Sequence, residues 1–163
     1  MSTTPINRRQ LRTLVFQALY AAELSEESLD EIFGKILTET YDQVLLQKPN
    51  RGFELSDADF MKALFYHTLQ DRVQYDHWIR SKAANWEVQR IAIVDRLLMY
   101  MALYEIINFH DIPVKVSLNE YLELAKEFST PKSSQFINGI IDSIHHQLRD
   151  ENKIVKRGRG LKD

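Results

Sequence analysis

Three arginines stand at the start of the first amphipathic segment of this chain. Arg8, Arg9 and Arg12 fall within the first twelve residues, which contain no acidic residue. A helix N-terminus carries about half a positive charge from its unpaired amides, so arginines there are unfavourable unless an anion is present. Arginine side chains and free amides can converge on one phosphate. The pattern indicates a phosphate-binding start, and a solvated basic turn is the alternative.

A second group of candidate residues is polar or aromatic and lies near apolar segments. The adjacent charges Asp95 and Arg96 interrupt an apolar run, and a Ser-Ser-Gln segment, which begins at Ser133, precedes Phe136. Single-stranded RNA is bound by exposed rings that stack on bases and by polar groups that reach base edges, for which Tyr20 and Phe136 are candidates. Helical periodicity alone favours core positions for both rings.

No catalytic or metal-binding constellation is found. The sequence has no cysteine, no glycine-rich phosphate loop and no H-E-x-x-H motif. His67 and His77 are ten residues apart, too far to chelate one ion on a helix. The side chains of His145 and His146 should diverge by about 100° and not face one ion. We therefore expect no enzyme, no cofactor and no metal site.

The bulk composition is that of an ordinary globular protein with uneven charge. The 163 residues are 44% hydrophobic and 27% charged, with a net charge of −2. Residues 23–59 carry ten acids and three bases, whereas the last eleven residues carry five bases and one acid. Such asymmetry is typical of basic ends that meet a polyanion. The lack of cysteine and of an apolar leader predicts a cytoplasmic protein that does not enter a membrane.

The hydrophobic periodicity predicts an all-α fold of two packed small helical bundles with six to seven helices. Ser28 and Glu31 have the spacing of a capping box, and Thr130-Pro131 marks another helix start. Gly139 in mid-helix suggests close contact with a neighbouring helix. The expected bundles are residues 1–84 and 85–150, followed by a basic, disordered tail over 151–163. The expected helices are 6–22, 28–47, 57–83, 91–107, 113–128 and 131–149.

The helix expected at 91–107 organises the second bundle. Fourteen of its seventeen residues are apolar or aromatic and cover its whole circumference, so other helices must surround it. Three charges, including Asp95 and Arg96, and its short length argue against a membrane span. An acid suits the first turn of a helix, so we interpret this pair as the exposed lip of a binding surface. A buried ion pair is the alternative.

Four motifs, in this order along residues 8–148, resemble those of the transcription antitermination factor NusB family. The first is an arginine-rich start closed by a Gln-Ala-Leu-Tyr segment, and the second is the apolar helix with its Asp-Arg pair. The third is an I-P-V-K-V block followed by N-E and A-K, and the fourth is F-I-N-G. They occupy residues 8–12 with 17–20, 91–105, 112–128 and 136–139.

The resemblance implies an all-helical, RNA-binding protein without enzymatic activity. It would bind boxA-type RNA together with the ribosomal protein NusE, within an RNA polymerase antitermination complex that promotes transcription of ribosomal RNA operons. The resemblance fits both a monomer and a homodimer. By position, the resemblance assigns RNA contacts to Arg8, Arg9, Arg12, Tyr20, Arg96 and Phe136, and partner contacts to Asp95, Lys132 and Ser133.

Some residues depart from the family pattern. Lys132 stands where members often carry an acid, and Ser117 and Tyr121 replace small apolar residues. Two alternatives stay open. One is an accessory RNA-binding module related to ribosomal RNA methyltransferases, against which the lack of a glycine-rich βαβ unit counts. The other is a protein-only helical scaffold.

Overall fold

The computed structural model describes residues 4–49, 52–83 and 90–162. Over these ranges all regular structure is helical and no strand is present, so the all-α prediction is confirmed. The chain divides into two compact units, Met1–Tyr66 (unit 1) and His67–Asp163 (unit 2). The expected division after residue 84 falls outside the described residues, and the observed boundary comes earlier, within the helix expected at 57–83.

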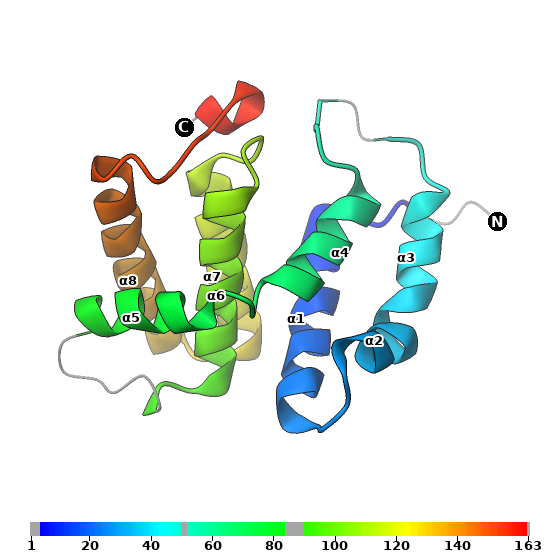
Figure 1. Cartoon of the computed structure of the whole chain (residues 1–163), viewed down its shortest axis with the longest axis horizontal. Coiled ribbons are helices and arrows are strands. Elements are labelled where there is room, and N and C mark those ends of the chain that lie inside the picture. Colours follow the sequence, from blue (N-terminus) through cyan, green and yellow to red (C-terminus); the bar gives the residue numbers. More distant parts are fainter. Residues whose placement is uncertain (1–3, 50–51, 84–89, 163) are drawn as a thin grey trace. The chain divides into compact units, whose positions relative to one another are not determined.

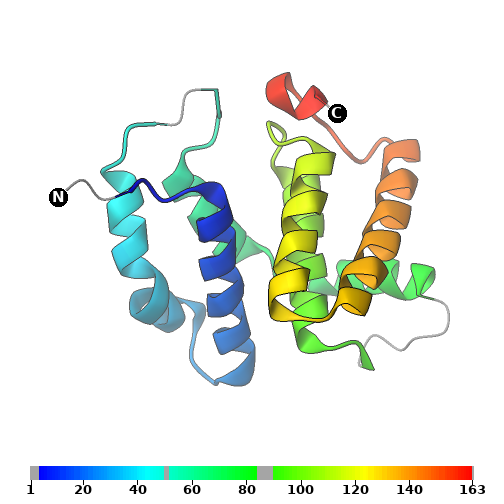
Figure 2. The same ribbon diagram turned by 180° about the vertical axis from the view of Figure 1, so that it is seen from behind.

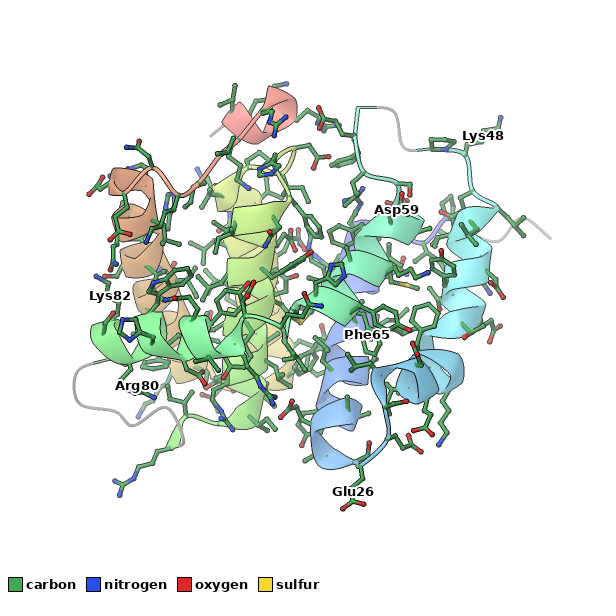
Figure 3. All side chains as sticks on the ribbon, viewed as in Figure 1. Glu26, Lys48, Asp59, Phe65, Arg80 and Lys82 are labelled. Atoms are coloured by element: carbon green, nitrogen blue, oxygen red, sulfur yellow. The ribbon has the colours of Figure 1, made fainter. Side chains whose placement is uncertain are left out.

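Unit 1 is built from α1 (Arg8–Leu24), an unbroken run of helical turns over residues 29–45, and most of α4 (Asp57–His67) (Figure 1). The run over residues 29–45 consists of α2 (Leu29–Ile32), the π-helical η1 (Phe33–Leu37) and α3 (Thr38–Leu45). The Ser28–Glu31 capping box that starts it is present as predicted. Phe65 of α4 points into the interior and packs on Phe33 with ring centroids 6.0 Å apart (Figure 3).

The single long helix expected over 57–83 is two helices. A turn at residues 68–71 separates α4 from α5 (Arg72–Lys82), and it is closed by a hydrogen bond from the Gln70 amide to the His67 carbonyl. The buried face of α4 serves the core of unit 1, whereas Tyr75 and Ile79 of α5 are buried in unit 2. Because α4 and α5 bury their apolar residues in different cores, the apolar residues of segment 57–83 do not follow one helical period. Val73, an apolar residue in the first turn of α5, is 81% exposed and belongs to neither core.

Unit 2 is organised around α6 (Ile93–Asn108), as the sequence predicts. It packs against α5, α7 (Val114–Phe128) and α8 (Pro131–Asp150), and α5 lies crosswise to the other three (Figures 1 and 2). The ten consecutive residues 97–106 are all buried. Within the described ranges, none of the helices is long and apolar enough to span a membrane.

The basic tail differs from the disordered segment that its composition suggests. Residues 153–162, which include the 3₁₀ helix η3 (Gly158–Leu161), pack against the turn between α6 and α7 (Figure 2). The Arg157 amide donates to the His110 carbonyl over 2.9 Å, and Lys156 Nζ donates to the Phe109 carbonyl over 2.9 Å. Fixed backbone partners hold the tail, and charge composition cannot reveal such partners.

The expected close contact at Gly139 is wrong. No atom lies within 4 Å of a Cβ built on Gly139, and the residue is exposed on α8. The close approach occurs at Gly160, where a Cβ would lie 2.0 Å from the His110 carbonyl oxygen. Glycine is therefore required in the tail and not in α8.

Candidate nucleic-acid and partner interface

A cavity of about 260 Å³ opens in unit 2 where α6 and α8 begin. Two of its walls come from segments that are far apart in sequence but whose helix starts lie together. Thr130 caps α8 through its hydroxyl, which accepts from the Ser133 amide over 3.1 Å, and Pro131 follows at the first helical position as predicted. The cavity is lined by Arg90, Ile91, Ala92, Asp95, Lys132, Ser133 and Phe136.

Asp95 ties the two helix starts together. Its Oδ1 accepts a hydrogen bond from Ser129 Oγ over 2.8 Å, and its Oδ2 accepts one from Ser133 Oγ over 2.7 Å. The carboxylate lies in the first turn of α6 and beside the first turn of α8, where the helix dipoles favour a negative charge. Asp95 is therefore a support beneath the cavity that holds Ser133 in place.

The expected exposed lip at Asp95-Arg96 is wrong, because Asp95 is only 6% exposed. The buried-pair alternative does not describe Asp95 either, since serine hydroxyls occupy both carboxylate oxygens. Adjacent residues of a helix point about 100° apart, which sends Arg96 away from Asp95. Arg96 is half-buried, and within the described ranges its Nε is buried without a hydrogen-bond partner.

Arg96 instead faces the side of α6 on which Tyr100 lies. Burial and a hydrogen bond to Asp76 raise the pKa of the Tyr100 hydroxyl, and the charge of Arg96 opposes that rise. Arg96 does not line the cavity. Arg96 follows Asp95 in the sequence, but the two side chains do different things in the structure. Asp95 supports the cavity, whereas Arg96 lies towards Tyr100.

The mouth of the cavity combines positive charge with an aromatic ring. Lys132 and Arg90 are exposed, and Phe136 is half-buried. Exposed cations attract phosphates without regard to sequence, and an accessible ring offers a surface on which an unpaired base can stack. This arrangement is chemically suited to a single-stranded nucleic acid.

Arg8 occupies a different environment from the one that the sequence suggests. Its Nε donates to Asp57 Oδ1 over 2.7 Å, and its Nη2 donates to the Leu55 carbonyl over 2.5 Å. The guanidinium carbon lies 4.4 Å from the ring centroid of Phe53 and 4.3 Å from that of Phe60. At 9% exposure, Arg8 joins the segment before α4 to α1 within unit 1.

The other residues of the arginine-rich start divide by exposure. Arg12 is 3% exposed and lies over the Phe60 ring at 5.1 Å, whereas the Arg9 side chain is exposed. Tyr20 is half-buried beside Phe16, with ring centroids 6.4 Å apart. These positions leave Arg9 as the arginine of this segment whose side chain reaches solvent.

The start of α1 also carries its own cap. The Asn7 side chain accepts from the Gln10 amide over 2.9 Å, and the Gln10 side chain accepts from the Asn7 amide over 2.8 Å. This capping box satisfies amides that an anion was expected to bind. The premise of a free helix start is therefore wrong for Arg8, Arg12 and the capped amides, whereas the side chain of Arg9 is exposed.

The structure gathers four of the predicted residues around one cavity. Asp95, Lys132, Ser133 and Phe136 meet in unit 2, while Arg8, Arg9, Arg12 and Tyr20 belong to unit 1. Sequence reasoning missed Arg90 and Ser129. Ser129 immediately precedes the Thr130-Pro131 helix start, and a serine at that point was the available signal.

Comparisons with known proteins agree on one family. The family model described as the NusB family matches residues 9–146. A protein of Chloroherpeton thalassium named "Transcription antitermination protein NusB" is 38% identical over 158 residues, which cover 97% of this chain and 70% of that protein. A protein of Salinibacter ruber with the same name is 37% identical over 155 residues, which cover 95% of this chain and 91% of that protein.

Solved structures give the same result for the fold. A structure of NusB from T. maritima matches with a TM-score of 0.73 and 30% identity, over 88% of this chain and 94% of that one. A structure of the antitermination factors NusB and NusE in complex with double-stranded RNA matches with a TM-score of 0.68 and 20% identity, over 86% of this chain and 96% of that one. At that identity it shows the fold alone.

These relatives are transcription antitermination proteins and not enzymes, which confirms the prediction that the chain is not an enzyme. The matched region includes Arg9 and Arg12 of the arginine-rich start, all of α6 and the start of α8. The chain belongs to the NusB family.

Proposed function

We propose that this protein is an RNA-binding transcription antitermination factor of the cytoplasm. It binds boxA-type RNA together with the ribosomal protein NusE, joins an RNA polymerase antitermination complex and promotes transcription of ribosomal RNA operons. Family membership supports the antitermination role. The observation that carries the RNA-binding part is the cavity in unit 2 with Lys132, Arg90 and Phe136 at its mouth.

In this proposal the residues around the cavity have separate roles. Lys132 and Arg90 hold phosphates, and the Phe136 ring stacks on an unpaired base. Asp95 positions Ser133 from below through their 2.7 Å hydrogen bond, and Ser133 presents the start of α8 to the partner protein. In unit 1, Arg9 and Tyr20 add RNA contacts, while Arg8 and Arg12 support the fold from inside.

The test is a salt-dependent RNA titration with and without NusE. Lys132→Glu should lower the affinity for a boxA-type RNA and reduce the salt slope by about 0.7, the value for one lost phosphate contact on a single strand. Phe136→Ala should weaken binding by about 1 to 3 kcal/mol without changing that slope. Arg80→Glu on α5 is the control, since it makes the same kind of charge reversal outside the cavity (Figure 3).

Two results would contradict the proposal. RNA affinities that are equal for the native chain, Lys132→Glu and Phe136→Ala would remove the cavity from RNA binding. A flat RNA titration together with tight binding to NusE would favour the protein-only scaffold.

A further inference from the structure

A second, larger cavity lies at the opposite end of α8, within the same unit. It has a volume of about 670 Å³, is open to solvent on one side, and is lined by the last turns of α8, the start of α7 and the basic tail. His145 and Arg149 of α8 and Lys156 of the tail contribute its cationic side chains. Twenty residues of α8 separate the two ends, a length of about 30 Å. The two cavities are therefore distinct.

The tail wall of this cavity is held by specific contacts. Asn152 adopts a left-handed conformation with φ of 57°, and the Lys153 amide donates to the Leu148 carbonyl over 2.8 Å, which turns the chain back after α8. His110 Nδ1 then lies 2.6 Å from the Val155 carbonyl oxygen, to which it donates, and Gly160 lies directly over the His110 carbonyl. The wall is fixed before any ligand binds.

The charged side chains that line the cavity are cationic. Its described lining contains one histidine, one arginine and one lysine, and no aspartate or glutamate. Burial, and then the neighbouring charges of His146 and Arg149, lower the pKa of His145, with a further contribution from Lys156 and only Asp142 opposing. Glu105 and Asp111 face Lys156, and Arg149 Nε lies 3.5 Å from Asp150 at the surface. Positive surroundings outweigh negative ones at His145.

A bound cation is the competing interpretation of the same region. Ligand atoms of Asp142, His145 and His146 all lie within 4.8 Å of one another, and His146 Nδ1 is 3.5 Å from Asp142 Oδ2. The side chains of His145 and His146 were expected to diverge and not to face one ion, but their ring centroids lie 5.5 Å apart and Asp142 lies one turn earlier on the same side of α8. However, Arg149 and Lys156 would repel a divalent ion at His145, whereas both would attract an anion.

We propose that the cavity formed by His145, Arg149, Lys156 and the tail backbone binds a phosphate group. Arginine, lysine and protonated histidine are the side chains that form charge-assisted hydrogen bonds with phosphate. The volume is within the range of small-molecule sites, so a nucleotide fits as well as one phosphate of an RNA chain. That the bound phosphate belongs to an RNA chain rests on the proposed function, whereas that it belongs to a free nucleotide does not.

The experiment titrates the full chain with inorganic pyrophosphate and follows the His145 ring by NMR. Pyrophosphate should shift its signals and raise the pKa of the ring, because a bound anion favours the protonated form. Arg149→Glu should weaken pyrophosphate binding by about tenfold or more, the loss expected for one charge-assisted hydrogen bond. The Arg149 side chain is 60% exposed, so the variant should fold. His145→Gln is a second variant, and Arg80→Glu on α5 is the charge-matched control.

Each outcome decides between the interpretations. No response of His145 to pyrophosphate, or equal affinities for Arg149→Glu and Arg80→Glu, would overturn the proposal. Tight Zn²⁺ binding with no pyrophosphate binding would assign the region to a cation and overturn it as well.

RNA affinity that falls in Arg149→Glu, beside the loss of pyrophosphate, supports an RNA phosphate as ligand. Unchanged RNA affinity beside that loss supports a free nucleotide. Pyrophosphate binding in a chain that binds no RNA would refute the proposed function and leave this inference standing.

Discussion

Tyr121 donates a 2.6 Å hydrogen bond to Oε2 of Glu105, a carboxylate that is fully buried in the centre of unit 2. Ser117 Oγ donates to the other oxygen over 2.9 Å. Both donors are one turn apart on α7 and are themselves fully buried. Ser117 and Tyr121 are the two residues of α7 that are expected, from the sequence, to depart from the family pattern. The structure explains them together, because a carboxylate removed from water needs such donors.

Tyr121→Phe should destabilise unit 2 by about 1.5 to 3 kcal/mol, since it leaves one oxygen of the buried Glu105 carboxylate without this donor. Ser117→Ala should cost a similar amount. Denaturant unfolding measured on the full chain gives the change. Tyr41→Phe in unit 1 controls for the loss of a phenolic hydroxyl, and equal effects of both tyrosine variants would contradict the role of Glu105.

Arg8 and Arg9 should separate stability from RNA binding. Arg8→Ala removes the partner of buried Asp57 and the cation between two rings, so unit 1 should lose about 3 kcal/mol or more. Arg9→Ala should leave stability within about 0.5 kcal/mol, because the side chain is exposed, yet weaken RNA binding. Thermal unfolding and RNA titration of both variants check this. A stable Arg8→Ala variant would show that the buried cluster is dispensable.

Gly160→Ala should release the tail, because its Cβ would meet the His110 carbonyl oxygen at 2.0 Å. Faster hydrogen exchange at the Arg157 amide, whose acceptor is that same carbonyl, would report the release. Gly139→Ala is the matched variant and should stabilise α8 by up to about 1 kcal/mol, since nothing obstructs the added methyl group. Opposite signs for the two substitutions are the expected result.

Docking of the tail should strengthen as the pH rises from about 8 towards 10.5. Burial lowers the pKa of Lys156 from 10.5 to about 8, against the opposing charges of Glu105 and Asp111. Between these values the free tail holds a proton that the docked tail has lost, so added base favours docking; below pH 8 the docked state carries the full cost of the buried charge. The NMR signals of the Val155 methyl groups should follow this change. Lys156→Met should remove this pH dependence of the Val155 signals. Val155 signals that do not change between pH 8 and 10.5 in the native chain would contradict the prediction.

Periodicity and capping signals predicted most helices, because these depend on neighbouring residues. The Ser28–Glu31 box, the Thr130-Pro131 start and the buried α6 could all be inferred from spacing. The break at residues 68–71 could not, since it depends on which core each half of the segment joins.

The candidate site was predictable only in part. The start of α8 could be identified from its capping residues. Whether an arginine faces solvent or a buried aspartate could not, because it depends on contacts between distant residues, such as Arg8 and Asp57, which are 49 positions apart in the sequence. The tail illustrates the same limit, because its partners are backbone carbonyls near Phe109 and His110 that no composition reveals.

The docked tail also bears on how this protein should be handled in the laboratory. Lys162, its last described residue, follows directly after the 3₁₀ helix that covers the His110 turn. An affinity tag or fluorescent fusion joined at the C-terminus would thus be anchored beside the cavity at the end of α8, and trimming the chain at Asp150 would strip away one wall of that cavity. Labels are better attached to the other end of the chain.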